Sequence, residues 1–466
     1  MSNANKKSIW TNPLTQSAVG KEVKLPEMIF GYFIGPFGAL LSSGIFTSFL
    51  QAYLGTVLGL DAGFLSVLQL VSTVLIVAAN LIVGQLIERT RVLAGKARPW
   101  ILLSALTLSV ASVLMFIVPF QGTARYVWIA IAYNLYYAVA YPIYNTANST
   151  MIPVSTRDSE KRSLLASMTN VAGLGVMGAG SMVFPILVAN VLTYEEANVS
   201  RWFICMLAIA IFSALTIYLQ FKFTRERVTE ESMTAGTEQT TAKAVSMGTQ
   251  LKAVASEKWW WVIILFYLCF QWSGAVKNGS MVYFCQKVLN DTTGGYQSLL
   301  AIMGAIPMAV AAVFVVPLAN KFGKRKVPMI GAAVGVAGGL LAGLFPDNIV
   351  MVCVGVAIKC LGSSPACYLI LAMLADVIDH VEYKNNIRTD GLTMSIYSSL
   401  MVAATPIGGA ILQALIAMLP IETASTVSYI WIETICYGIC TVLMLFFNVE
   451  KNLKQEQAEI QARRKE

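Results

Sequence analysis

The segment KFTRERVTEESMTAGTEQTTAKAVSMGTQLKAVASEK, residues 222–258, decides how the rest of the chain is organised. It is rich in Thr, Ser, Lys and Glu and has no aromatic residue after Phe223, so it cannot bury enough apolar surface to fold as a domain. Long apolar runs lie on both sides of it. We therefore expect a polar linker between two membrane-embedded halves. Its last part, from Gly248 to Lys258, is predicted to form a short surface helix that leads into three interfacial tryptophans, 259–261.

The composition is that of an integral membrane protein. Of the 466 residues, 56% are hydrophobic and only 12% are charged, with a mean hydropathy of +0.66. Soluble domains usually carry about 25% charged residues. The net charge of +8 does not indicate a nucleic-acid partner, because the chain has no RNA- or DNA-binding motif and membrane proteins gather Lys and Arg on their cytosolic side. The expected partners are membrane lipid and a small solute.

Cysteine and histidine usage argues against a metal site. The eight cysteines lie in apolar runs without a CxxC pair, and His380 is the only histidine. We therefore expect neither a structural metal nor a disulfide framework, and no cofactor apart from a coupling ion, H⁺ or Na⁺. Residues 1–27 are polar and lack the apolar core of a signal peptide, so the first membrane helix is expected to direct insertion itself.

Segments long enough to cross a membrane occur six times on each side of the linker. Such a helix needs about 20 apolar residues. The candidates are 28–57, 63–87, 99–119, 126–152, 163–190 and 202–221, then 259–288, 295–319, 327–345, 348–378, 392–419 and 427–447. The sequence therefore predicts an all-α membrane protein with 12 transmembrane helices in two six-helix bundles, 28–221 and 259–447, flanked by the tails 1–27 and 448–466.

The basic residues predict the orientation. With the N-terminus inside, the tails, the linker and the other inner connections hold 28 of the 33 Lys and Arg residues, and the outer connections hold three. The remaining two, Lys277 and Lys359, lie inside apolar runs. Because basic residues stay on the cytosolic side, both termini and the linker are predicted to be cytosolic in a multi-pass protein of the plasma membrane.

The two halves repeat each other. A basic loop follows the second helix of the first half (residues 84–99), and a similar loop, PLANKFGKRK at 317–326, lies at the matching place in the second half. Two sets of six helices with equivalent basic loops are typical of the parallel repeat of the major facilitator fold. Glycines at a spacing of four, as at 331, 335, 339 and 343, predict close helix contacts.

Three motifs resemble one family, the glycoside–pentoside–hexuronide:cation symporters of the melibiose permease type. The most specific is ADVIDHVEYKNNIRTDG at 375–391; the others are GKARPW at 95–100 and the loop 317–326. The resemblance spans nearly the whole chain. It implies uptake of sugars or glycosides by alternating access, coupled to protons or sodium.

The chain departs from that family at the known binding positions. The two helix 2 aspartates of the cation site fall at Ile76 and Asn80, the helix 4 aspartate at Asn145, and the helix 5 arginine near Thr169 or Asn170. The helix 1 sugar-site aspartate falls at Leu40, the tryptophan that stacks on the sugar at Ser149, and the helix 11 lysine at Val402. An amide and an isoleucine cannot supply the charge of two carboxylates, so coupling, if it uses this region, would involve Asn80.

Three ionisable residues lie inside predicted spans and are functional candidates for that reason. Lys359 is predicted to lie about 16 Å from the outer end of its helix, near the middle of the membrane. Lys277 is flanked by Gly274 and Gly279 in a polar stretch. Glu433 is either a proton carrier or the partner of a buried lysine, or else, as its modest depth of about 10 Å slightly favours, a residue near the outer interface.

A polar and aromatic stripe on the fourth helix is the best candidate for a sugar-binding wall. Its members recur every three or four residues and so share one helix face. Aromatic rings stack on sugars and amides bind hydroxyl groups, although such stripes can also be core packing. The predicted substrate-binding residues are Lys277, Lys359, Asn134, Tyr137, Tyr141, Asn145, Asn148, Asn170, Gln271, Trp272 and Tyr397.

Charged residues at the inner helix ends are candidates for a cytosolic gate. Opposite charges there can pair to hold the gate shut and separate when it opens, although exposed pairs are individually weak. The predicted gate residues are Arg89, Arg98, Asp376, Asp379 and Arg388.

A secondary transporter of sugars or glycosides, expected to be a cation-coupled monomer, is the function favoured by the sequence. Two lysines and no central aspartates favour an acidic sugar such as a hexuronide. The alternatives are an uncoupled facilitator or exchanger of neutral glycosides and a transporter-like sensor. A primary pump is disfavoured because no GxxxxGK[ST] phosphate loop occurs, and an enzyme because no catalytic constellation does.

Overall fold

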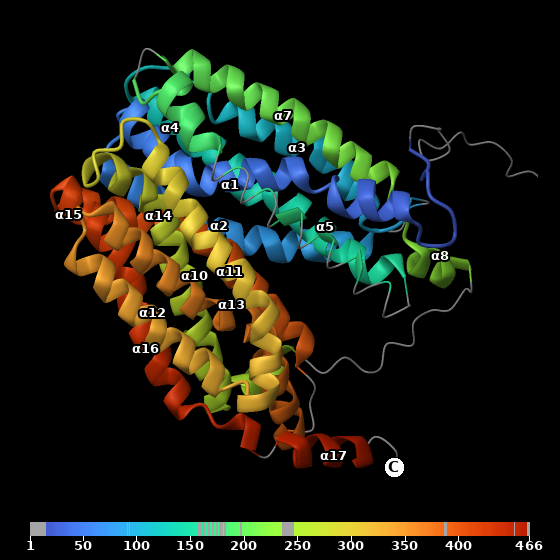
Figure 1. Cartoon of the computed structure of the whole chain (residues 1–466). Coiled ribbons are helices and arrows are strands. Elements are labelled where there is room, and N and C mark those ends of the chain that lie inside the picture. The colour runs from blue at the N-terminus through green and yellow to red at the C-terminus, as the bar shows by residue number, and fades with distance from the viewer. Residues whose placement is uncertain are drawn as a thin grey trace, which may run out of the picture.

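Figure 1 shows the computed structural model of the chain, in which helices form two bundles. The structure describes residues 15–463 except 91, 93, 157–160, 162–163, 166–167, 170–171, 174–175, 177–179, 181–182, 196–197, 235–246, 386–388 and 452.

The first bundle begins with a bent helix. The π-helical turn η2 (Glu27–Phe33) is separated from α1 (Phe37–Ala52) at Pro36, which lacks the N–H that would continue the hydrogen-bond ladder. A second π-helical turn, η3 (Tyr53–Val57), ends this span. The bundle continues with α2 (Ala62–Arg89), α3 (Arg98–Leu114), α4 (Thr123–Asn134), η4 (Leu135–Ala140), α5 (Tyr141–Ser155), η5 (Val188–Leu192) and α7 (Val199–Lys222).

The linker contains two short helices, α8 (Arg227–Thr234) and α9 (Met247–Ala255). The second confirms the surface helix expected before the tryptophans. The first residues of the linker are not solvated, however: Glu226 and Arg227 are buried against the first bundle. That burial is explained by their hydrogen bonds, described below.

The second bundle has the helices α10 (Lys258–Lys287), α11 (Gly295–Phe322), α12 (Lys326–Leu344), α13 (Ile349–Asn385), α14 (Asp390–Met418), α15 (Ile421–Thr426), η7 (Val427–Trp431) and α16 (Ile432–Phe446), followed by η8 (Val449–Lys451) and α17 (Leu453–Arg463). The glycines of α12 pack as expected. A Cβ atom at Gly331 would lie 2.4 Å from the carbonyl oxygen of Gly362 on α13, and one at Gly339 would meet the side chain of Thr434 on α16. Only glycine allows helices to approach this closely.

Nine helical spans within the described residues are long and apolar enough to cross a membrane. The other three expected spans are shorter or more polar: 99–119 corresponds to the 17-residue α3, 126–152 to α4, η4 and α5, and 163–190 is described only in part. Asparagines, threonines and tyrosines make the α4–α5 segment less apolar than its neighbours. The described residues alone therefore do not show all twelve spans.

The two bundles meet at one end. We call the end where α7 finishes and α10 begins the linker end, and the opposite end the far end. Residues Val402 and Leu412 of α14 belong to the apolar core of the first bundle, and α2 packs on α14 as α1 does on α10. From this contact the bundles diverge, so that α8 and α17 lie far apart in Figure 1.

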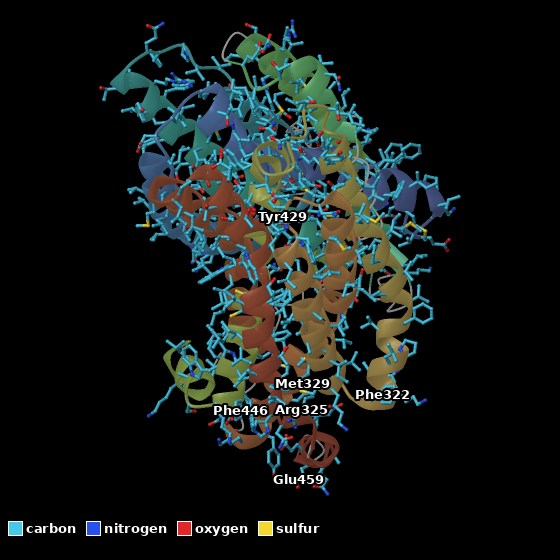
Figure 2. All side chains as sticks on the ribbon, turned by 60° about the vertical axis from the view of Figure 1, so that its left-hand side comes forward. Phe322, Arg325, Met329, Tyr429, Phe446 and Glu459 are labelled. Carbon is cyan, nitrogen blue, oxygen red and sulfur yellow. The ribbon has the colours of Figure 1, made fainter. Side chains whose placement is uncertain are left out.

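Figure 2 shows the second bundle along its length. Tyr429, just before α16, lies beside the first bundle, whereas Phe446, Arg325 and Phe322 lie at the linker end, away from it. The structure is thus closed at the far end and spread at the linker end.

Candidate functional site

Three charged side chains meet inside the second bundle. The Glu433 carboxylate lies 2.7 Å from the Lys359 ammonium and 3.1 Å from the Lys277 ammonium. The Tyr437 hydroxyl donates a hydrogen bond of 2.7 Å to Glu433 Oε1, and Lys359 Nζ donates one of 3.4 Å to the carbonyl oxygen of Tyr429. We call Lys277, Lys359 and Glu433 the charged triad.

Each member of the charged triad comes from a different helix. Lys277 lies on α10, Lys359 on α13 and Glu433 on α16, each about 10 to 12 residues, or about 15 to 18 Å, from the far end. The slightly favoured interpretation of Glu433 as a residue near the outer interface is wrong, because its side chain is only 2% exposed. The depth estimate failed because the helix of Glu433 begins at Ile421, several residues earlier than expected.

The aromatic stripe of the fourth helix is only partly on the surface of the bundle. Tyr137 is buried and packs against Phe46, Tyr133 and Tyr136. The π-helical turn η4 falls in the middle of the stripe and rotates the residues after it, which an ideal helical spacing cannot anticipate. Tyr141, by contrast, is half-buried.

The asparagines near this stripe have different partners. Asn148 accepts a hydrogen bond of 2.6 Å from Gln220 on α7, which fixes it inside the bundle. Asn80 accepts a longer one, 3.4 Å, from Thr146, and Asn145 is half-buried. Within the described part of the chain, Asn80 Nδ2 and Asn134 Oδ1 are buried without a hydrogen-bond partner. An unsatisfied buried polar atom costs about 1–3 kcal/mol, so a bound solute that supplies the partner would be favoured there.

The remaining substrate-binding candidates lie in the second bundle. Gln271 donates a hydrogen bond of 3.2 Å to Tyr267, whose ring stacks on Tyr397 at 4.3 Å. The indole N–H of Trp272 is buried without a partner among the described residues. Asn170 lies outside the described residues.

The position expected from the family for the cation site is apolar. Ile76 is fully buried, and it belongs to the same apolar cluster as Val402. Neither Ile76 nor Val402 has a side-chain oxygen atom that could bind a cation, which agrees with the loss of the carboxylates in the sequence. Asn80 lies one turn further along α2, and Ser72 and Thr73 lie one turn before Ile76.

Two of the predicted gate residues, Arg98 and Asp376, have partners within their own bundles in this structure. Arg98 donates to the carbonyl oxygens of Phe221 and Ala94, and Asp376 lies 2.7 Å from the Lys324 ammonium. Arg89 is exposed and Asp379 is half-buried, whereas Arg388 lies outside the described residues. Since the bundles are separated at this end, a pairing between them in a closed state stays a prediction.

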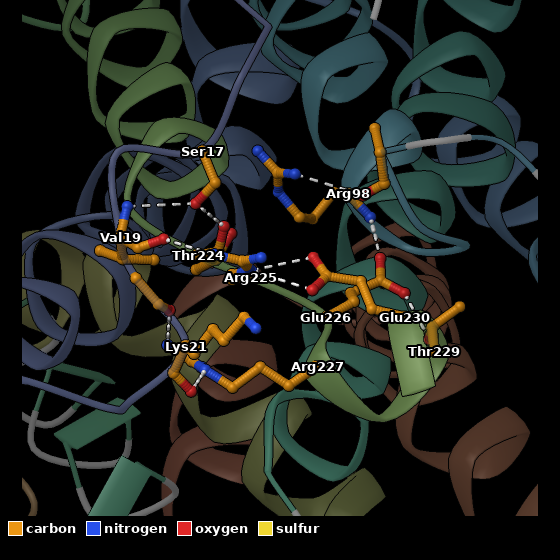
Figure 3. Close-up of polar contacts among 12 residues, drawn as sticks. Ser17, Val19, Lys21, Arg98, Thr224, Arg225, Glu226, Arg227, Thr229 and Glu230 are labelled. Carbon is orange, nitrogen blue, oxygen red and sulfur yellow. Dashed lines mark hydrogen bonds and ion pairs between the residues drawn. The ribbon is translucent and has the colours of Figure 1, made fainter. Parts of the chain in front are cut away.

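Polar contacts at the linker end include two side chains that the sequence did not single out. Glu226 accepts hydrogen bonds from the backbone N–H groups of three consecutive residues, 96–98, at 2.8 Å each. Arg227 forms a two-bond ion pair with Glu27 and donates to carbonyl oxygens of residues 20–22. Figure 3 shows how these residues join the start of the linker to the N-terminal segment and to the start of α3.

A second missed group joins the bundles at the far end. Gln51 and Gln69 exchange hydrogen bonds of 2.9 and 3.2 Å, and Gln413 donates one of 3.1 Å to Gln51. The Tyr283 hydroxyl donates to the backbone carbonyl of Gln51, and Ser66 donates to that of Ala410. We call Gln51, Gln69 and Gln413 the glutamine clasp. Amides inside otherwise apolar spans are the signal that would have found it.

The comparisons with known proteins agree with this architecture. A family model described as "MFS/sugar transport protein" matches residues 31–450. The chain belongs to this family of major facilitator transporters. It is a transporter and not an enzyme, as expected from the sequence, and its likeness to glycoside–cation symporters is confirmed.

Individual relatives align with most of the length of this MFS/sugar transport protein. It is 28% identical to the isoprimeverose transporter of Lactiplantibacillus pentosus, over 94% of this chain and 92% of the relative. It is 23% identical to the glucuronide carrier protein homolog of Escherichia coli, over 82% and 81%. The fold resembles that of the xylose transporter XylE from E. coli in its inward open conformation, with a TM-score of 0.62 and 14% identity over 93% and 98%.

Proposed function

We propose that this protein moves a sugar or glycoside across the plasma membrane by alternating access, coupled to a proton or a sodium ion. The family match and the sugar-transporting relatives support this proposal. Among the described residues, the hydrogen bonds between the two bundles all lie toward the far end. This observation is the main structural support for alternating access. Two bundles hinged in this way can expose a site between them to one side at a time.

The orientation follows from the charge distribution. Both termini and the linker are cytosolic, because the linker end carries nearly all the basic residues. The present structure is then closed to the outside by the glutamine clasp and open to the cytosol. A single chain supplies both bundles, so the working unit is a monomer surrounded by lipid.

A second candidate function is uncoupled facilitation or exchange of a sugar. It is favoured by Ile76, which places one of the family's two cation-site positions within an apolar cluster. Coupling in the proposed symporter therefore requires a different group; of the two sequence candidates, Glu433 is already paired with two lysines, which leaves Asn80.

The test is uptake by the purified protein in proteoliposomes. A panel of neutral and acidic sugars and glycosides is offered with a sodium gradient, a proton gradient or neither. Accumulation above equilibrium with one gradient supports the symporter, and equilibration at equal rates in all three conditions supports the facilitator. Failure to move any sugar, with protein that is folded by thermal unfolding, contradicts both.

A further inference from the structure

The charged triad has a net charge of +1. Two ammonium groups face one carboxylate, and no second carboxylate pairs with either lysine in the part of the chain that the structure describes. A buried charge without a partner costs several kcal/mol. The triad is therefore a site where one further negative charge would be stabilised.

The two lysines are not equivalent. Lys359 is 1% exposed and lies closer to Glu433, and its ammonium also donates to the backbone of Tyr429. Lys277 is 18% exposed, its ion pair is longer, and its other polar contact is a sulfur, Cys360 Sγ at 3.9 Å. Lys359 and Glu433 thus form a closed pair, and Lys277 is the ammonium that a solute can reach.

Open space lies next to Lys277. Gly274, three residues earlier, is on the same face of α10, and a Cβ atom at that position would meet no atom within 4 Å. Polar side chains flank this space along the helix, because Gln271 precedes Gly274 by three residues and Asn278 follows it by four. Helices α1, α13, α14 and α16 all pack on α10, and Gln271, Gly274, Lys277 and Asn278 are half-buried.

We propose that Lys277 binds an anionic group of the transported solute, and that Glu433 occupies this lysine while the site is empty. The proposal rests on the transport function above and names the solute class: a sugar acid, with one carboxylate. As the solute arrives, the Lys277 ammonium exchanges Glu433 for the solute carboxylate. Glu433 remains paired with Lys359 and hydrogen-bonded to Tyr437, and the excess positive charge is neutralised.

This arrangement assigns Glu433 the role of a positioning residue. Protonation of Glu433 would leave two ammonium groups facing each other without a counter-charge, which opposes proton loading at this carboxylate. A neutral sugar likewise leaves the excess charge uncompensated. The triad therefore selects for one negative charge.

Two variants of the charged triad test the proposal. Lys277→Met leaves the neutral Lys359–Glu433 pair, and the double variant Lys359→Met with Glu433→Gln leaves Lys277 as the single charge. Neither variant raises the net charge of the triad above the +1 of the wild type, so both are expected to fold. Binding of methyl glucuronide and methyl glucoside, and of the corresponding galacturonide and galactoside, is measured by calorimetry in detergent.

We expect the wild type to bind at least one uronide about tenfold more tightly than its neutral counterpart, the equivalent of one ion pair. Lys277→Met removes this preference, whereas the double variant keeps or strengthens it because the internal competitor is gone. Equal affinity of wild type and Lys277→Met for the uronides, or no uronide binding by the wild type, overturns the proposal. Uptake of neutral glycosides would then still support the proposed transport function.

Discussion

Glu226 and Glu450 occupy equivalent places in the two halves of the protein. Each lies just beyond the last long helix of its bundle, and each carboxylate accepts hydrogen bonds from backbone N–H groups at the start of the third helix of that bundle. The residue before those N–H groups is a glycine with positive φ, Gly95 at 109° and Gly323 at 96°. A Cβ atom there would lie 2.4 or 2.8 Å from the carboxylate.

The internal repeat of the two halves therefore includes these individual hydrogen bonds. Helix N-termini have N–H groups without partners inside the helix and a partial positive charge, and a carboxylate satisfies both. The glycines are required because the loop needs a left-handed backbone and leaves no room for a side chain. The basic loops seen in the sequence are thus anchored by an acidic residue more than 120 positions away.

Replacing Glu226 by Ala is expected to destabilise the first bundle by about 2 kcal/mol or more, because three backbone N–H groups, two of them buried, lose their acceptor. The measurement is thermal unfolding in detergent. Glu450→Ala is the matched control: its carboxylate is exposed and accepts only two backbone hydrogen bonds, so a smaller loss is expected. An equal loss in the two variants would contradict the interpretation.

Replacing Arg227 by Lys is expected to release the N-terminal segment. The guanidinium bonds both carboxylate oxygens of Glu27 and several backbone carbonyl groups at once, which a lysine cannot do. Trypsin should then cleave faster after Lys21 and Lys24. Arg89→Lys, at an exposed position, serves as the control and should be cleaved at the wild-type rate. An unchanged rate in Arg227→Lys would contradict the role given to Arg227 in holding the N-terminal segment.

Much of this fold follows from apolar run length and charge distribution. Those features predicted the two bundles, the linker and the α12 glycines, because membrane helices must be long, apolar and closely packed. The triad was found in part, since lysines inside apolar runs are conspicuous. Glu433 was assigned to the wrong environment because its helix begins several residues before the start that the apolar run suggested.

Contacts between distant segments were not predictable in the same way. The glutamine clasp joins Gln51 to Gln413 across the two halves, and its members are uncharged, so neither periodicity nor charge identifies them. The π-helical turn η4 shifts the register of the aromatic stripe and buries Tyr137. Such local departures from ideal helices depend on tertiary packing.

Substituting Gly409 by Val is expected to weaken closure at the far end. A Cβ atom at Gly409 would collide with Gln69 Oε1 and approach Gln51 Nε2 to 2.5 Å, so the clasp must separate. We expect the population open at the far end to rise, which is measured as faster labelling of an engineered Ser66→Cys by a membrane-impermeant maleimide. Gly438→Val, where no atom lies within 4 Å, is the control. Unchanged labelling in Gly409→Val would exclude the clasp as the outer gate.

Replacing Glu433 by Gln alone is expected to destabilise the protein by about 3–5 kcal/mol, because it leaves two buried ammonium groups with no counter-charge. Adding Lys359→Met should restore most of this loss, since only Lys277, the more exposed lysine, then remains charged. Thermal unfolding of the wild type, of Glu433→Gln, of Lys359→Met and of the double variant forms a double-mutant cycle. This cycle measures the interaction free energy between Lys359 and Glu433. Glu422→Gln, an exposed carboxylate on α15, should leave stability unchanged. If the stability losses of the two single variants simply add, the ion pair does not hold α13 to α16, and Glu433 does not act as the positioning residue that we propose.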